Sequence, residues 1–341
     1  MRYLIIGPKM TDNVHTHGGT PVLVEQLLKY MNKTNKNYKF ISTQHFGEGK
    51  AIANFLYTLT KLLINLPKVD IVIVNVSRNG AYYFSPIALF FSKLFKKRFV
   101  FRRFGGNCLE LYEKAKGFRK KLIKFVFNNS DIMFFEPKYM VKYFKEQGKN
   151  AFWLPNSREA SSSQRDLNLP YRKKFIFLGH IIKEKGIDEI LKASQELDDS
   201  YEIKIYGSLK YGNYTKESFS AYSNVKYCGI LEHSEVYNAL CKSDVLLLPS
   251  YKEGYPGVII EAFAVGLPVV VSKIDSILEM VDNSCAKVVD IKDSTALVEA
   301  IKSFNQENYR DFAIASKEKF KDYEINSVHK RMLQICEEDL V

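Results

Sequence analysis

Short apolar runs alternate with amphipathic helical patterns along the whole chain, and this alternation restricts the possible folds more than any other feature. Between the runs, segments such as Pro21–Met31 and Tyr112–Asn128 place apolar residues at i, i+3 and i+4, which predicts helices. Strands separated by helices favour a parallel sheet covered on both faces. In the first half, the runs that predict strands are Tyr3–Ile6, Lys39–Ser42, Ile71–Val76, Arg98–Phe101, Ile132–Phe135 and Phe152–Leu154.

A polar stretch, Asn156–Pro170, interrupts this pattern and is typical of a linker, because it lacks apolar periodicity. The alternation then restarts, and a chain of 341 residues exceeds the roughly 250–300 at which one core usually stops growing. We therefore expect an α/β protein with two doubly wound domains, residues 1–165 and 166–323, facing a central cleft. A helix within residues 324–341 is expected to pack back on the first domain. The later strands expected are Phe175–Leu178, Ile203–Tyr206, Val225–Tyr227, Val245–Leu248 and Val269–Val271.

The cysteines and the apolar segments indicate a cytoplasmic protein. The five cysteines are scattered without a C-x-x-C pair, which favours neither a zinc site nor a disulfide framework. The apolar run at the N-terminus is too short for a signal peptide. The longest apolar stretch, around Ala81–Phe91, is shorter than the ~20 residues needed to span a bilayer.

Charge is distributed unevenly along the chain. Residues 1–165 hold 28 basic and 10 acidic side chains, a net charge of +18, whereas the remainder has a net charge of −6. Two basic segments also contain apolar residues, Ser92–Arg98 and Lys114–Phe127, and on a helix the second would group Phe118, Leu122, Phe125 and Val126. This composition suits an anionic membrane surface, although a core-facing helix with a solvated basic face explains it equally well. No nucleic-acid-binding motif accompanies the charge, so nucleic acid is not an expected partner.

Residues Asp244–Ser272 predict a strand, a loop, a helix and a second strand. Val245–Leu248 is an apolar run, the following loop is rich in Gly and Pro, and Val258–Val265 is a helical segment. Gly266 stands where a left-handed residue ends a helix, and Pro268 prevents its continuation.

This unit predicts a binding site for a nucleotide-sugar. A helix N-terminus carries about half a positive charge and free N–H groups, which favour an anion, and Gly254 and Gly257 allow the backbone to approach a phosphate. Glu253 and Glu261 would repel phosphate but can accept hydrogen bonds from hydroxyls. A diphosphate flanked by two polyols has this chemistry. Read in isolation, the two acids and two glycines also fit an ordinary helix end and turn.

The stretch Asp244–Val270 resembles the signature of the retaining GT-B glycosyltransferases of family 4 (glycosyl transferases group 1). The family pattern runs aspartate, apolar strand, Pro-Ser, Glu-Gly, Glu-Ala and Gly-x-Pro-Val, and each part has a counterpart here. Weaker matches follow the family order at Gly18-Gly19, Pro155-Asn156, Gly179–Asp188, Tyr206-Gly207 and Val225–Gly229.

The resemblance implies a GT-B fold, a UDP- or GDP-sugar donor and a lipid-linked or oligosaccharide acceptor in surface polysaccharide synthesis. It implies that Lys185 binds the diphosphate, Glu253 the transferred sugar and Glu261 the ribose. The other donor-binding residues that it implies are Gly18, Gly19, His180, Ile230, Leu231, Gly254, Tyr255, Pro256, Gly257 and Val258.

This chain departs from the family pattern at two places. His180 stands where the family has a phosphate-binding arginine, and the histidine that many relatives carry near the reacting sugar has no clear counterpart. Asn107 is a candidate for that catalytic position, beside Glu253 and Lys185. Candidates for the missing positive charge or for contacts with the acceptor are His15, Arg78, Arg102 and Arg103, with His17 also near the glycine loop.

The resemblance further implies retention of anomeric configuration by front-face substitution, with no bound metal and no cofactor. The enzyme would lie peripherally on the inner face of the cell membrane. The alternatives are another GT-B enzyme, such as a sugar-nucleotide epimerase or an inverting transferase, and a basic nucleic-acid-binding protein.

Overall fold

The computed structural model describes residues 1–9, 19–47, 49–76, 78–105, 112–161, 163 and 165–338. The chain forms two compact units. Unit 1 consists of Met1–Ser157 and Ile325–Val341, and unit 2 of Arg158–Glu324. The first unit is therefore discontinuous in sequence, and its second segment is a single helix.

Unit 1 contains a six-stranded parallel sheet in the order β2-β1-β3-β4-β5-β6. Each strand agrees to within two residues with an apolar run of the sequence. Because the chain pairs β2 with one side of β1 and β3 with the other, the direction of winding reverses between β1 and β3. The strands are β1 (Arg2–Gly7), β2 (Asn37–Ser42), β3 (Ile71–Val76), β4 (Arg98–Arg103), β5 (Ile132–Phe135) and β6 (Ala151–Trp153).

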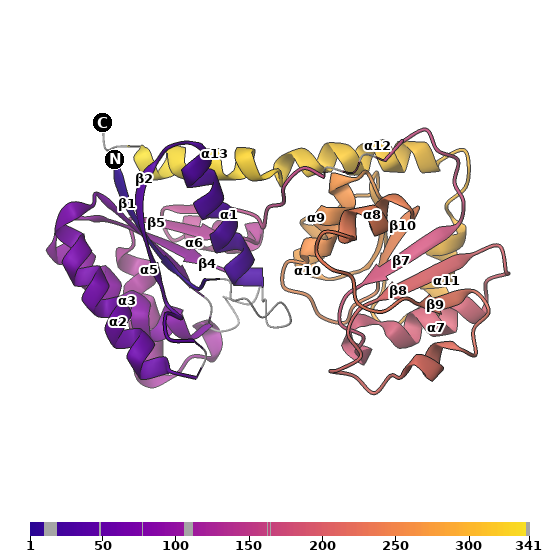
Figure 1. Cartoon of the computed structure of the whole chain (residues 1–341), viewed down its shortest axis with the longest axis horizontal. Coiled ribbons are helices and arrows are strands. Elements are labelled where there is room, and N and C mark those ends of the chain that lie inside the picture. Colours follow the sequence, from indigo (N-terminus) through magenta and orange to yellow (C-terminus); the bar gives the residue numbers. More distant parts are fainter. Residues whose placement is uncertain are drawn as a thin grey trace. The chain divides into compact units, whose positions relative to one another are not determined.

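Helices cover both faces of this sheet (Figure 1). On one face α1 and α13 pack against Tyr3, Ile5 and Ile73, with Met332 of α13 fully buried. On the other face lie α2, α3, α5 and α6. The helices of unit 1 are α1 (Gly19–Lys33), α2 (Ala51–Asn65), α3 (Arg78–Leu94), α5 (Gly117–Asn129), α6 (Lys138–Lys145) and α13 (Ile325–Glu337).

Unit 2 contains a second six-stranded parallel sheet in the order β12-β11-β10-β7-β8-β9, and its winding reverses between β7 and β10. In Figure 1, α8 and α9 lie on one side of the sheet and α7 and α11 on the other. The strands are β7 (Lys174–Leu178), β8 (Glu202–Tyr206), β9 (Val225–Tyr227), β10 (Val245–Leu248), β11 (Val269–Ser272) and β12 (Ala286–Val289). The helices are α7 (Ile187–Gln195), α8 (Val236–Cys241), α9 (Gly257–Ala264), α10 (Asp275–Leu278), α11 (Ser294–Lys302) and α12 (Tyr309–Lys319).

The polar stretch before β7 is only partly the linker that its composition predicts. It contains no helix or strand among its described residues, but Arg165 is buried and donates to the carboxylate of Asp244 and to the hydroxyl of Tyr309. The stretch after Arg158 is thereby anchored inside unit 2. Across the described ranges, none of the helices combines the length and apolar character of a membrane-spanning segment.

Candidate active site

The two loops that carry the predicted donor-binding residues lie side by side in unit 2. One loop follows β7 and contains Lys185, and the other follows β10 and contains Glu253. Because β7 and β10 are neighbours at the reversal of strand order, their carboxyl ends open the crevice in which α/β sheets of this type bind ligands.

Lys185 and Glu253 form an ion pair at this point, with Nζ of the lysine 2.6 Å from Oε1 of the glutamate. The side chain of Glu253 is 8% exposed and that of Lys185 is 23% exposed. Ser250 also donates its hydroxyl to the same glutamate oxygen over 2.8 Å. The ion pair holds the ammonium group of Lys185 at the edge of the sheet. A phosphate group at this edge would accept a hydrogen bond from that ammonium group in place of part of its contact with Glu253.

The loop after β10 is fixed by further hydrogen bonds. Tyr251 donates its backbone N–H to the carbonyl of Glu184 and its hydroxyl to both carboxylate oxygens of the buried Glu189, each at 2.8 Å. Burial and this carboxylate raise the pKa of the Tyr251 hydroxyl, so it remains a neutral donor. Ser276 donates to the carbonyl of Glu253 over 3.1 Å. These contacts make the site largely preformed.

Gly186 allows the two loops to approach each other. Its φ of +77° is in the left-handed region, and a Cβ atom there would lie 2.1 Å from the carbonyl oxygen of Pro249. Only glycine meets both conditions at this position. The residue after Lys185 is thus packed directly against the first residue of the loop that holds Glu253.

Helix α9 begins at Gly257, one residue earlier than the sequence predicts, and its first N–H groups have no partner within the helix. Glu261 lies one turn into this helix, where its Oε1 accepts from Nε of Arg158 over 2.6 Å. Arg158 also donates its backbone N–H to the carbonyl of Tyr323. Sequence reasoning did not find this arginine, because it falls in the predicted linker, 103 residues from Glu261.

The remaining predicted donor residues of unit 2 differ in exposure. His180 is exposed, with its ring edge-on to Tyr211 at a centroid distance of 5.1 Å. Ile230 is also exposed and Leu231 half-buried, so both are accessible to a flat ligand. Tyr255 and Pro256 are buried, whereas Gly254, Gly257 and Val258 are half-buried. We therefore expect contacts in this part of the loop to come from the backbone.

In unit 1 the structure buries two of the predicted site residues. Strand β4 continues through Arg102 and Arg103, and both side chains are buried at its carboxyl end. Arg102 lies over the ring of Phe104, 4.6 Å from its centroid, and burial lowers its pKa to about 10. This arginine thus stays positively charged at neutral pH.

Other predicted residues of this half cannot be placed. His15, His17, Gly18 and Asn107 lie outside the described residues. Only the backbone of Gly19 and Arg78 is described, at the first positions of α1 and α3 respectively.

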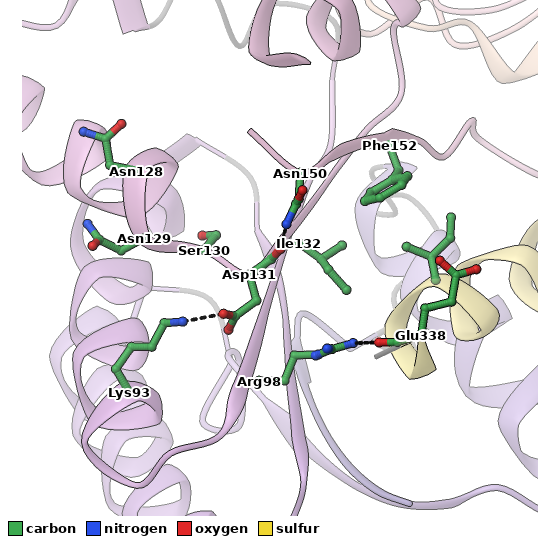
Figure 2. Close-up of a pocket in the computed structure, with 11 residues that line it drawn as sticks. Lys93, Arg98, Asn128, Asn129, Ser130, Asp131, Ile132, Asn150, Phe152 and Glu338 are labelled. Carbon is green, nitrogen blue, oxygen red and sulfur yellow. Dashed lines mark hydrogen bonds and ion pairs between the residues drawn. The ribbon is translucent and has the colours of Figure 1, made fainter. Parts of the chain in front are cut away.

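One cavity of the described part of the chain lies away from the predicted site. It has a volume of about 530 Å³ and lies in unit 1 at the amino ends of β4, β5 and β6. Figure 2 shows its polar side chains paired with each other: Lys93 with Asp131, and Arg98 with the carbonyl of Glu338. Ligands of parallel sheets bind at the opposite, carboxyl edge, and these paired groups leave little bonding capacity for a ligand.

Comparison with known proteins finds a family similarity in the second half of the chain. Residues 159–324 match the family model of the glycosyl transferases group 1. TuaC of Bacillus subtilis (strain 168), named for teichuronic acid biosynthesis, is 27% identical over 45% of this chain and 38% of its own length. The capsular polysaccharide biosynthesis glycosyltransferase CapM of Staphylococcus aureus is 28% identical over 40% of this chain and 37% of its own. The chain thus spans less than half of the length of both relatives.

Solved structures resemble the chain over nearly its whole length. Sucrose-phosphate synthase from Thermosynechococcus elongatus superposes with a TM-score of 0.76 at 14% identity, covering 99% of both chains. HepE of Anabaena in complex with UDP superposes with a TM-score of 0.72 at 12% identity, covering 98% of this chain and 99% of that one. With its two parallel sheets, the chain has the α/β GT-B fold, and its residues 159–324 are similar to the glycosyl transferases group 1.

Proposed function

We propose that the protein is a glycosyltransferase that moves a sugar from a nucleotide-sugar to a saccharide acceptor in bacterial surface polysaccharide synthesis. The observation that carries this proposal is the Lys185–Glu253 pair at the strand reversal of unit 2, inside the region that matches the family model. The named relatives TuaC and CapM support the polysaccharide context.

Each charged group of the site has a role in the proposal. Lys185 exchanges part of its bond with Glu253 for the donor diphosphate, and the N-terminus of α9 adds its partial positive charge. Glu253 then contacts the transferred sugar, and Glu261 accepts hydrogen bonds from the ribose hydroxyls. Arg158 is a positioning residue, since its bond to Glu261 leaves the second carboxylate oxygen for the ribose.

The proposed chemical step is substitution with retention. The acceptor oxygen forms a bond to the anomeric carbon on the face from which the diphosphate leaves, and the leaving oxygen takes the acceptor proton. Preorganised positive charge at the leaving group is the largest contribution we expect to the rate. NMR analysis of the product tests this step: an inverted anomeric centre, or epimerisation without transfer, would contradict it.

We propose a UDP-sugar as the donor, because a solved neighbour of the same fold, HepE, is described in complex with UDP-glucose. Thermal unfolding in the presence of UDP-, GDP- and ADP-sugars tests this choice. The expected result is a rise in melting temperature with UDP-sugars that is lost in Lys185→Ala. A larger rise with GDP- or ADP-sugars would contradict the choice of base without affecting the class of enzyme.

Helices α2, α3 and α5 support the proposal of a lipid-linked acceptor. In α2 the polar residues Asn54, Thr58 and Asn65 are buried, while Ile52 and Leu56 are 78% and 57% exposed. In α5 Val126 packs in the core, contrary to the apolar side expected from the sequence, whereas Phe118 is exposed. We name these exposed apolar side chains the apolar face. Its members are Ile52, Leu56, Ile64, Tyr83, Phe90, Leu94, Phe118 and Phe125.

Basic side chains lie on the same three helices, among them Lys61, Lys93, Arg119 and Lys120. Exposed apolar groups accompanied by positive charge suit the interface of an anionic bilayer, to which each basic residue near the surface adds about 1 kcal/mol. One relative, from Campylobacter jejuni, is named for transfer to a diphospho-undecaprenol sugar, which is a lipid-linked acceptor. We therefore propose that the apolar face rests on an anionic membrane surface.

Co-sedimentation with vesicles containing phosphatidylglycerol tests the membrane contact. We expect Leu56→Glu to weaken binding at least fivefold, and Ile314→Glu, at an exposed position of unit 2, to leave it unchanged. Equal binding by the two variants, or none by the wild-type protein, would argue for an acceptor in solution.

A further inference from the structure

Tyr251 connects the loop after β10 to two parts of the chain that follow β7. Its backbone N–H donates to the carbonyl of Glu184 over 2.8 Å, next to Lys185 in the sequence. Its hydroxyl lies 2.8 Å from both carboxylate oxygens of Glu189, in the first turn of α7. Because Glu253 belongs to the same loop as Tyr251, this tyrosine ties the loop of Glu253 both to the turn that carries Lys185 and to α7.

The carboxylate of Glu189 is a fixed anchor for the tyrosine hydroxyl. The residue is 4% exposed. In the part of the chain that the structure describes, its side chain has no ion pair and no hydrogen-bond donor other than Tyr251. The partial positive charge of the helix N-terminus stabilises an acid at this position of α7. A buried acceptor is costly to leave without its donor, so the hydroxyl of Tyr251 is held at this place.

The aromatic ring of Tyr251 has a contact of its own. Nζ of Lys292, in the loop after β12, lies 5.0 Å from the centroid of the ring, which is within reach of a cation–π interaction. Replacing Tyr251 with phenylalanine keeps the ring and this contact, and removes only the hydroxyl. The variant Tyr251→Phe therefore tests the bond to Glu189 by itself.

Tyr214 makes the same kind of bond to the neighbouring residue of α7. Its hydroxyl donates to the carboxylate of Asp188 over 2.6 Å, also in the first turn of the helix. Burial and the adjacent carboxylate raise the pKa of both tyrosine hydroxyls, so both remain neutral donors. Tyr214 belongs to the segment after β8, and none of its hydrogen bonds in the described ranges reaches the loop after β10. Tyr214→Phe is thus a matched control.

We propose that Tyr251 and Glu189 are positioning residues that hold Glu253 against Lys185. Their bond anchors the loop on α7, and Ser250, the neighbour of Tyr251, donates its hydroxyl to Oε1 of Glu253 over 2.8 Å. Without this anchor the loop shifts, and the 2.6 Å contact between Lys185 and Glu253 lengthens. The effect of this shift on sugar transfer rests on the proposed function, whereas the dependence of the ion pair on Tyr251 does not.

Chemical labelling of Lys185 tests this dependence without any substrate. Acetic anhydride labels an amine faster when its contact with a carboxylate is loosened, and mass spectrometry of the digested full-length protein resolves each lysine. We expect Lys185 to be labelled about threefold faster in Tyr251→Phe than in the wild-type protein, and at the wild-type rate in Tyr214→Phe. Lys204, which pairs with Glu202 over 2.8 Å, is the internal reference. An unchanged rate in Tyr251→Phe, or an equal rise in both variants, would overturn the inference.

A second background keeps the test valid if the unpaired carboxylate of Tyr251→Phe prevents folding. Glu189→Gln retains an oxygen that accepts the hydroxyl of Tyr251. Adding Tyr251→Phe to it removes the bond without leaving a buried charge unpaired. The double variant should label Lys185 about threefold faster than the wild-type protein, and Glu189→Gln alone at the wild-type rate. Fast labelling in Glu189→Gln alone would contradict a positioning role, because the hydrogen bond is still present in that variant.

Turnover separates this inference from the proposed function. A residue that acts through Glu253 has no effect once Glu253 is replaced. We expect Tyr251→Phe to lower kcat about tenfold while the Kd for UDP stays within about twofold of the wild-type value, and to cause no further loss in Glu253→Gln. A tenfold further loss in Glu253→Gln would overturn the inference. No transfer from any nucleotide-sugar, with labelling of Lys185 still dependent on Tyr251, would remove the proposed function and leave the positioning role.

Discussion

Replacing Gly186 with alanine should separate the two loops of the donor site. The new Cβ would lie 2.1 Å from the carbonyl oxygen of Pro249, whereas ordinary contacts begin at 3.4 Å, so the backbone must move by about an ångström. Alanine at a φ of +77° costs about 1–2 kcal/mol, and overpacking typically adds about 1–3 kcal/mol. We expect the free energy of unfolding of unit 2 to fall by about 2–5 kcal/mol, which lowers its Tm by roughly 5–15 °C.

Gly229→Ala is the matched control for this variant. Its φ of +81° imposes the same backbone cost, but no atom lies within 4 Å of the position of a Cβ. The control should therefore lose only about 1–2 kcal/mol of stability. The difference in Tm between the two variants, measured by calorimetry, isolates the contact with Pro249.

The backbone displacement in Gly186→Ala should also weaken the binding of the nucleotide. Lys185 precedes Gly186, and Glu253 follows Pro249 in the adjoining loop, so the shift lengthens the 2.6 Å ion pair and misplaces the ammonium group. We expect the Kd for UDP, measured by titration calorimetry, to rise about tenfold, equivalent to about 1.4 kcal/mol. Equal Tm shifts in the two glycine variants, or wild-type UDP affinity in Gly186→Ala, would refute this reasoning.

Three further predictions concern catalysis, metal dependence and acid stability. Glu253→Gln and Lys185→Ala should each lower kcat about 10²–10³-fold while circular dichroism shows an intact fold; near-normal turnover of both would remove the site assignment. Activity should persist in EDTA. Within the described ranges, no group of three or more His, Cys, Asp or Glu side chains could hold a metal ion. A loss of activity in EDTA that Mg²⁺ or Mn²⁺ restores would contradict the prediction. Burial, with the charge of Arg102, lowers the pKa of His329 to about 3. The unfolded chain therefore binds a proton below about pH 6.5 that the folded chain does not, and stability falls as pH falls. His329→Leu should flatten this dependence between about pH 6.5 and 4 in urea titrations, and the exposed-site control His233→Gln should not.

Local features of the fold could be predicted from the sequence because they depend on neighbouring residues. Gly266 is an example: its position before Pro268 predicts a left-handed helix end, and its φ of +70° confirms it. Strand β12 was not predicted, and its pairing with β11 comes from the assembled sheet.

Features that depend on distant parts of the chain could not be predicted in this way. The bond between Arg158 and Glu261 joins a segment without apolar periodicity to a helix 103 residues away. In α2, the periodicity of apolar residues cannot reveal that Asn54 and Thr58 are buried while Ile52 is exposed. The hydrogen bonds that satisfy Asn54 and Thr58 are made with the loop after β2 and with the backbone of the helix. Both features follow from tertiary contacts.

The route of the chain has a consequence for its synthesis on the ribosome. The core of unit 1 includes Val328, Met332 and Leu333 of α13, which is translated only after the whole of unit 2. Domains generally fold as units in the order in which they emerge. Here the domain that emerges first cannot complete its core until the last helix arrives, so the face of its sheet containing Tyr3 and Ile73 stays partly uncovered while unit 2 folds. The nascent chain therefore passes through a stage at which it needs protection from aggregation, however stable the finished protein is.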